Sequence, residues 1–430
     1  MDIYRFLLDL ALILFTTKTL GIIMKKIGLP QVLGALLSGV ILGVSKLVNG
    51  DNNVGLELFS TIGVNLIMFS AGMETNLKEI KKNGIASILI TVLGVIIPLL
   101  FGFGVSFIIP NISLKSRWFI GVILTATSVG ITVSTLKELG VLHGKVGASI
   151  VTAAILDDII GIIILAFFTA NVTENSLGAR LITLFGGDYL QLASLVTLLN
   201  VILFFAIGIG VGILIHFLFK VLSSHNPHTR RLSIFGLVIC FVYAWGAEKL
   251  FGVAAITGSF LAGMMISHMP QSAYVEKRID TSAYMMFSPI FFAYIGISMP
   301  YDTLIKNFNL QILFFSLAFV AVGLLSKLIG CGLGARICKY KYNECFKVGI
   351  GMMVRGEVCL IVAKSGEAQG LIDTTYFPAI VFLIIISSIL VPILLKLLFK
   401  KYPATNLVDN NESINTVVRV HNQFNEHSDN

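Results

Sequence analysis

The run Val146–Ala170 reads VGASIVTAAILDDIIGIIILAFFTA and carries two adjacent aspartates, Asp157 and Asp158, near its centre. Apart from that pair, the run has no charged residue. As a helix rising about 1.5 Å per residue, it is long enough to cross about 30 Å of hydrocarbon. Backbone polar groups in lipid must bond within the segment, which favours a helix. The stretch therefore predicts a transmembrane helix with acidic groups at mid-depth.

Long apolar runs of this kind fill most of the chain. It has 430 residues, a mean hydropathy of +0.90, 56% hydrophobic residues and 13% charged residues, too few to cover a soluble surface. Ten-residue segments of alternating polarity, which would indicate a membrane β-barrel, are absent. The sequence predicts an all-α membrane protein with about 13 transmembrane helices. The other predicted spans are Ile3–Met24, Leu29–Ser45, Glu57–Met73, Gly84–Ile109, Trp118–Leu136, Gln191–Leu222, Leu232–Ala247, Val253–Ser267, Thr281–Ser298, Leu310–Ala335, Phe346–Gly366 and Thr374–Phe399.

Basic residues near the ends of these spans predict the orientation. Nineteen Lys and Arg residues fall on one predicted side of the membrane and eight on the other. Cytoplasmic loops carry the excess of positive charge, so the N-terminus is predicted outside and the C-terminus in the cytoplasm. This distribution also accounts for the formal net charge of +8. We therefore expect the lipid bilayer, and no nucleic acid, as the partner of these basic residues.

Thirteen spans divide into six, one linker helix over about 191–222, and six. The halves, about 1–170 and 232–400, then have inverted topology. The fifth span of each half is interrupted by polar residues, Thr125-Ala126-Thr127-Ser128 in the first and Arg355-Gly356-Glu357 in the second. Interrupted spans in matching positions indicate a binding site at the bilayer midplane of a secondary transporter. The alternative is two unrelated helices that happen to carry polar residues.

The aspartate pair is the first candidate for the chemistry. A carboxylate at mid-depth costs at least about 2.5 kcal/mol on insertion scales, which indicates a functional reason for it. A carboxylate can hold either a hard monovalent cation or a proton, and that competition can couple their movements. A purely structural pair is the alternative. An intramembrane aspartyl protease is disfavoured, because consecutive helical residues point about 100° apart and cannot easily share one proton.

Lys327 is a second charge within a span, roughly 13 Å from the predicted cytoplasmic end at about 1.5 Å per residue. One interpretation is a salt bridge to one of the aspartates that breaks when the cation arrives. Desolvation lowers the pKa of a lysine, so Lys327 could itself release a transported proton. The alternative is a side chain that snorkels to the interface.

Arg355 and Glu357 flank Gly356, which is consistent with a local break in the helix. The ends of the two half-helices need compensating charge, with carboxylates near N-termini and cations near C-termini. Thr127 and Ser128 could bond freed backbone groups or lend oxygens to an ion. The alternative is an ordinary buried ion pair between Arg355 and Glu357.

Three motifs resemble the bacterial monovalent cation:proton antiporter-2 family, within the sodium/proton exchanger superfamily that includes NapA-like and GerN-like members. They are LTATSVGITV at Leu124–Val133, ILDDIIG at Ile155–Gly161 and GMMVRGEV at Gly351–Val358. The motifs occur in the right order in both halves, and the resemblance extends to about Lys401.

This resemblance implies a homodimer in the bacterial plasma membrane whose moving core carries the site across the bilayer, elevator fashion. It further implies that Asp158 binds the ion (Na⁺ or K⁺), that Asp157 pairs with Lys327, and that Thr127–Ser128 and Arg355–Glu357 lie on crossed broken helices. Exchange of more than one proton per cation, and hence electrogenic transport, is also implied. We expect no cofactor and no enzymatic activity.

Two other classes of function stay open, a gated cation channel and a sodium-coupled organic anion symporter on the same fold. An ATP-driven pump is disfavoured, since the sequence has no G-x-x-x-x-G-K-[ST] loop. Residues 403–430 are polar and Asn-rich and predict a disordered cytoplasmic tail without a nucleotide-binding domain. The sequence does not distinguish Na⁺ from K⁺.

Overall fold

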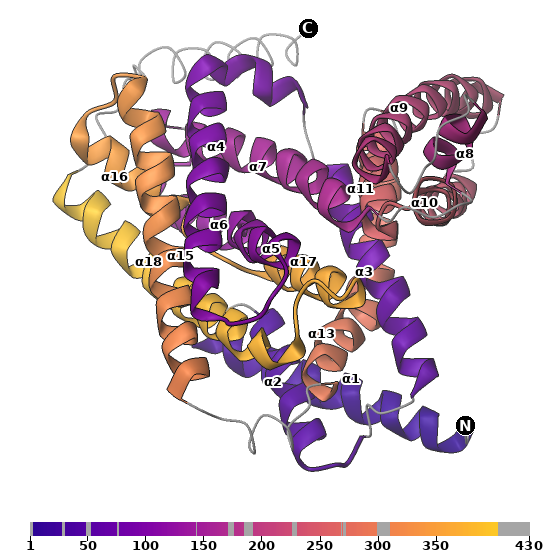
Figure 1. The fold of residues 1–430 in the computed structure, drawn as a ribbon, viewed down its shortest axis with the longest axis horizontal. Coiled ribbons are helices and arrows are strands. Elements are labelled where there is room, and N and C mark those ends of the chain that lie inside the picture. Colours follow the sequence, from indigo (N-terminus) through magenta and orange to yellow (C-terminus); the bar gives the residue numbers. More distant parts are fainter. Residues whose placement is uncertain are drawn as a thin grey trace, which may run out of the picture.

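The computed structural model describes residues 3–27, 31–48, 53–74, 77–142, 144–170, 176–184, 192–225, 230–267, 269, 272–298 and 310–402. Every regular element in those ranges is helical (Figure 1). The elements of the first half are α1 (Ile3–Lys26), α2 (Gln31–Val44), α3 (Val54–Glu74), α4 (Leu77–Val105), η1 (Ser106–Ile108), α5 (Leu114–Thr125), α6 (Val129–Glu138), α7 (Lys145–Thr169), α8 (Leu177–Leu184) and α9 (Ala193–His225). Those of the second half are α10 (Arg230–Phe251), α11 (Ala255–Ser267), α12 (Ser272–Ser282), η2 (Ala283–Phe287), α13 (Ser288–Ile297), α15 (Leu310–Ile337), α16 (Tyr342–Gly351), α17 (Glu357–Ala368), η3 (Thr374–Tyr376) and α18 (Phe377–Lys401).

Eight helices in the described part of the chain are long and apolar enough to cross a membrane: α1, α3, α4, α7, α9, α10, α15 and α18. The apolar helices α2 and α11 are shorter, with 14 and 13 residues. Each of the predicted spans coincides with one helix or with consecutive helical elements. All-helical membrane architecture is thereby confirmed, whereas the number of crossings and the inverted repeats stay predictions.

Some helices continue beyond the predicted spans into polar sequence. α4 begins at Leu77, ahead of the span predicted from Gly84, and α12 begins at Ser272, ahead of the span predicted from Thr281. The short helix α8 was not predicted. Hydropathy marks the length of chain suited to hydrocarbon, and helices extend beyond that length where caps and packing allow. The predicted tail over residues 403–430 lies outside the described residues.

The helices pack into two bundles. The first bundle contains α1, α2, α3, α10, α11, α12 and α13, and the second contains α4 to α7 and α15 to α18. Figure 1 shows α4, α15 and α18 side by side in the second bundle, away from α1 and α3. The helix α9 packs on α10 and α11 of the first bundle and also contacts α7 of the second. It therefore contacts both bundles, and the linker role predicted for residues 191–222 stays a prediction.

Within each bundle, glycines bring helix backbones into direct contact. A Cβ atom added at Gly39 would lie 2.0 Å from the Ala293 carbonyl oxygen, and one at Gly263 would lie 2.1 Å from that of Phe69. In the second bundle, the corresponding distance from Gly121 to the Leu99 oxygen is 2.3 Å. None of the glycines in the described ranges approaches the backbone of the other bundle in this way. The close helix contacts thus lie inside each bundle.

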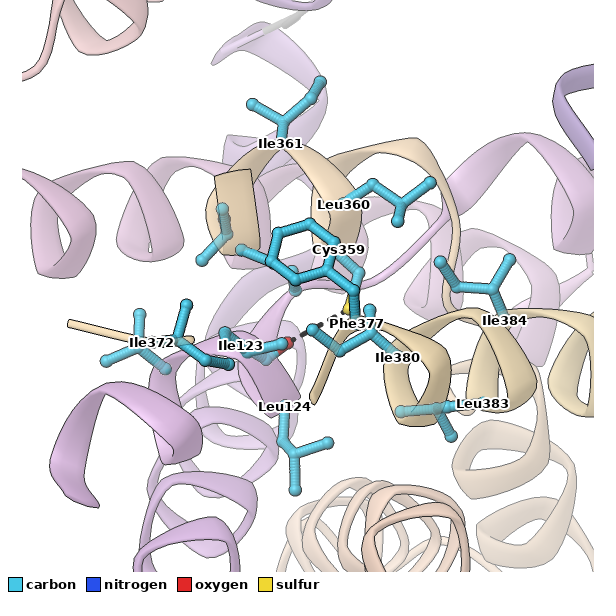
Figure 2. Close-up of a cluster of buried hydrophobic side chains, with 14 of the residues drawn as sticks. Ile123, Leu124, Cys359, Leu360, Ile361, Ile372, Phe377, Ile380, Leu383 and Ile384 are labelled. Atoms are coloured by element: carbon cyan, nitrogen blue, oxygen red, sulfur yellow. Dashed lines mark hydrogen bonds between the residues drawn. The ribbon is translucent and has the colours of Figure 1, made fainter. Parts of the chain in front are cut away.

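Between the bundles, apolar side chains meet instead of backbones. One hydrophobic cluster includes Met68 and Phe260 of the first bundle together with Val122 and Ile162 of the second. Figure 2 shows the part of this cluster inside the second bundle, where α5, α17 and α18 converge and the Cys359 thiol donates to a backbone carbonyl of α5. Each bundle is therefore tightly joined internally, and the boundary between them is mostly apolar.

These contacts predict that Gly263→Ala destabilises the protein. Its new methyl group must push α3 and α11 apart, and overpacking of this kind costs about 1–3 kcal/mol. Gly210 in α9 is the matched control, because no atom lies within 4 Å of a Cβ at that position. Gly210→Ala should be neutral or slightly stabilising, since alanine has the higher helix propensity. Thermal unfolding in detergent measures the difference, and equal midpoints for the two variants would contradict it.

Candidate functional site

Two helices are interrupted at the centre of the second bundle, and their interruptions contact each other. The first break separates α5 from α6 over residues 126–128, and the second separates α16 from α17 over residues 352–356. The Ser128 N–H donates to the Val354 carbonyl oxygen at 2.9 Å, and the Thr132 hydroxyl donates to that of Gly351 at 2.7 Å. Freed backbone groups of one break are thus bonded by the other.

Gly356 explains how closely the two breaks can meet. A Cβ atom at this position would lie 2.6 Å from Ser128 Oγ and 2.7 Å from Ser128 Cβ. Any larger residue would separate the two unwound segments. The Ser128 side chain therefore fills the space beside Gly356, while its backbone joins the breaks.

Arg355 neutralises the ends of the half-helices. The side chain is fully buried, and its Nη1 lies 3.1 Å from the Met353 oxygen, with Met352 and Val354 oxygens at 3.3 and 3.4 Å. Its Nη2 donates to the carbonyls of Leu124 at 2.8 Å and Gly323 at 3.1 Å. The acceptors at 352–354 and Leu124 belong to the C-terminal ends of α16 and α5, where a helix has unpaired carbonyls and partial negative charge.

These hydrogen bonds locate Arg355 beside backbone carbonyls, and its role in charge compensation stays a prediction. Glu357 is the first residue of α17, at the positive end of that half-helix, which is the location in which a carboxylate is favourable. Its side chain lies outside the described part of the structure, so its proposed role stays a prediction.

Asp157 is bonded on both carboxylate oxygens. Lys327 Nζ from α15 lies 2.6 Å from Oδ1, and the Thr127 hydroxyl from the first break donates to Oδ2 at 2.6 Å. Lys327 is fully buried and Asp157 is 3% exposed, so Lys327 does not snorkel to an interface. In a region of low dielectric, each charge of such a pair depends on the other for its stability.

Asp158 faces a different environment from Asp157. It is half-buried and lines a small cavity that Asp157 also borders. Successive residues of a helix diverge by about 100°, so the two carboxylates point in different directions, and that of Asp157 reaches Lys327 of α15. The other lining residues are Met68, Ala71, Val122, Thr125, Ala126, Gly161, Ile162, Phe260, Val358 and Val362.

This cavity lies between the bundles and has few polar groups. Met68, Ala71 and Phe260 form the wall from the first bundle, and every other lining residue comes from the second. Besides the aspartates, Thr125 is the one lining residue with a polar side chain, and its hydroxyl already donates to the Val122 carbonyl at 2.7 Å. A cation entering this cavity would meet a carboxylate as its strongest ligand.

Sequence reasoning identified the charged groups of this site but missed its apolar wall and its backbone acceptors. Met68 and Phe260 lie in ordinary apolar spans, and no pattern distinguishes them from residues that face lipid. The Gly323 carbonyl, which accepts from Arg355, gives no sequence signal either. Ser387, whose hydroxyl accepts from the Arg355 backbone N–H at 3.0 Å, could have been noticed only as a polar residue in a predicted span.

The buried pair predicts strong coupling between Lys327 and Asp157. Lys327→Met should destabilise the protein by about 3–5 kcal/mol, because it leaves a buried carboxylate without its counter-charge. Adding Asp157→Asn to that variant should restore part of the loss, since no uncompensated charge remains. A double-mutant cycle of thermal unfolding midpoints in detergent measures this coupling. Strictly additive effects of the two substitutions would contradict it.

Known proteins resemble this chain both in sequence and in fold. A family model for the sodium/hydrogen exchanger, transmembrane, matches residues 11–401. The Na(+)/H(+)-K(+) antiporter GerN of Bacillus cereus is 35% identical over 92% of this chain and 97% of its own length, and a Na(+)/H(+) antiporter of Enterococcus hirae is 33% identical over 91% and 97%. The structure of the sodium proton antiporter MjNhaP1 from Methanocaldococcus jannaschii shares the fold, with a TM-score of 0.66, 16% identity, and coverage of 94% and 100%. The chain belongs to the transmembrane sodium/hydrogen exchanger family.

Proposed function

We propose that this protein exchanges a monovalent cation, Na⁺ or K⁺, for protons, and that Asp158 is the group for which they compete. The observation that carries the proposal is the difference between the two adjacent aspartates. Both aspartates border the cavity, and both carboxylate oxygens of Asp157 are already bonded, one to Lys327 and one to Thr127. We therefore assign the binding of the incoming ion to the Asp158 carboxylate.

The chemistry of exchange follows from the location of Asp158 at the cavity. A cation and a proton both neutralise the same carboxylate, so binding of one disfavours binding of the other. A charged carboxylate beside apolar walls is costly, which favours movement of the site only when the charge is neutralised. Coupling then requires no further group, and the inward proton gradient can drive the cation outward.

The two bundles support alternating access of the elevator type. Asp158, both helix breaks and Lys327 belong to the second bundle, and the opposite wall of the cavity belongs to the first. Among the described residues, no glycine brings the backbones of the two bundles into close contact, and the packing between the bundles is mostly apolar. Sliding of one bundle past the other would therefore break few specific bonds. In this proposal the first bundle forms the homodimer in a bacterial plasma membrane, with the N-terminus outside and inverted repeats over about 1–170 and 232–400.

Asp158→Asn should abolish cation/proton exchange, because an amide cannot take up a proton or neutralise a cation. Dye-monitored proton flux in proteoliposomes, titrated with Na⁺ and K⁺ in turn, measures the loss. Glu248→Gln is the matched control, since Glu248 is an exposed carboxylate on α10, and it should leave exchange intact. Retained uphill exchange in a folded Asp158→Asn protein would refute the assignment, and cation flux that cannot build a gradient in the native protein would indicate a channel.

Lys327→Ala should change the charge moved per cation or the pH dependence of exchange. Lys327 is the sole partner of Asp157 in an ion pair within the described residues, so its removal alters which protons the site can hold. Reversal potentials in proteoliposomes give the charge moved per ion, and initial rates give the pH profile. If both quantities match those of the native protein, Lys327 has no part in proton coupling.

A further inference from the structure

The helix α4 contacts both helices of the buried ion pair from one of its faces. Thr91 and Gly94 lie three residues apart on α4, which puts them on the same side of the helix. The helix packs against α7, which carries Asp157, and against α15, which carries Lys327 (Figure 1). Neither α4 residue is among those that line the cavity. Each of them nevertheless has a contact that bears on the distance between the two charges.

Thr91 joins α4 to α7 one turn before Asp157. The Thr91 side chain is fully buried, and its hydroxyl oxygen lies 2.8 Å from the Ser87 carbonyl oxygen of its own helix and 2.9 Å from the Ala153 carbonyl oxygen of α7. In an α-helix, the carbonyl of residue 153 also accepts from the N–H of residue 157. The Thr91 hydroxyl therefore contacts the same peptide oxygen that fixes the backbone of Asp157. A change in this contact would move α7 relative to α4 at the depth of the carboxylate.

Gly94 leaves room for Lys327 against α4. A Cβ atom added at Gly94 would lie 3.8 Å from Lys327 Nζ and 2.5 Å from the Sγ atom of Cys331, which is one turn further along α15. Lys327 and Cys331 are both fully buried, so neither side chain has solvent to move into. Gly330 and Gly334 bring α15 close, because a Cβ atom at either position would lie 2.6 Å from the α4 backbone. The bare backbone at Gly94 thus provides the space through which the lysine reaches α7.

We propose that Thr91 and Gly94 are positioning residues that set the separation of Asp157 and Lys327. The pair depends on that separation, because both the hydrogen bond and the charge attraction weaken as the 2.6 Å contact lengthens. Among the described residues, Lys327 donates to no second acceptor that could compensate. The positioning itself does not require transport, whereas its effect on proton coupling rests on the proposed function.

Thr91→Val tests the contact with α7. Valine has nearly the same shape as threonine, but a carbon atom ordinarily lies about 3.3–3.6 Å from a carbonyl oxygen, farther than the 2.9 Å of the hydroxyl. The substitution should therefore push α7 away from α4. Thr169→Val is the matched control, because Thr169 is buried on α7 and its hydroxyl donates within that helix, to the Leu165 carbonyl at 2.8 Å.

Gly94→Ala tests the contact with α15. Its methyl group would displace the Cys331 Sγ atom and, through it, the turn of α15 that carries Lys327. Gly104→Ala on the same helix is the matched control, because no atom lies within 4 Å of a Cβ atom at that position. Adding Cys331→Ala to Gly94→Ala removes the atom in conflict and should reverse the effect.

The readout is the coupling between Lys327→Met and Asp157→Asn, measured in each background by a double-mutant cycle of thermal unfolding midpoints of the full chain in detergent. We expect this coupling to fall to about half or less in both test variants, and to keep its native size in both controls and in the rescued double variant. A residue that only stabilises the fold would lower all midpoints of a cycle equally and leave the coupling unchanged. Native coupling in the test variants, or an equal loss in the controls, would overturn the inference.

Exchange in proteoliposomes supplies a second readout. Thr91→Val should shift the pH of half-maximal exchange, whereas Thr169→Val should keep the native value. A native pH profile together with reduced coupling would support the positioning and contradict the role of Lys327 in exchange. A native profile together with native coupling would overturn the positioning. If Lys327→Met yields no folded protein, Lys327→Gln replaces it in the cycle, with the same expectations.

Discussion

The ion pair between Asp157 and Lys327 is the constraint on which the rest of the site depends. Both side chains are removed from water, and at 2.6 Å each supplies the counter-charge that the other needs. Asp157 is turned towards α15 and is also bonded by Thr127, while Asp158, which points about 100° away on the same helix, borders the cavity together with it. One of two chemically identical neighbours is thus engaged in an ion pair, which makes Asp158 the proposed group for the exchanged ion.

The helix breaks expose polar groups in an apolar environment, and the contacts around the breaks satisfy them. Two interruptions in one bundle expose backbone groups and helix ends, which lipid cannot satisfy. Arg355 donates to carbonyls from α5, α15 and the break after α16, while Ser128 and Val354 bond the breaks to each other. These bonds join the breaks to the helices around Asp157, so in the proposed elevator movement the breaks and the aspartates would travel together.

Much of this arrangement could be predicted because charge is scarce in the sequence. Asp157, Lys327 and Arg355 stand out in apolar runs, and the lengths of those runs locate the helices. The polar extensions of α4 and α12 could not be predicted, because hydropathy indicates which residues suit hydrocarbon and does not indicate where a helix begins. The location of Met68 and Phe260 at the cavity could not be predicted either, because an apolar residue in a membrane helix can face lipid, another helix or a cavity.

The central claim is that one carboxylate, Asp158, holds either a cation or a proton. Its most direct test is the apparent Michaelis constant for Na⁺ or K⁺ in the native protein, measured by solid-supported membrane currents over a range of pH. Competition for one carboxylate predicts that this constant rises as the pH falls, approaching about tenfold per pH unit, while the maximal current at saturating cation stays the same. A constant independent of pH, with only the maximal current changing, would contradict the account.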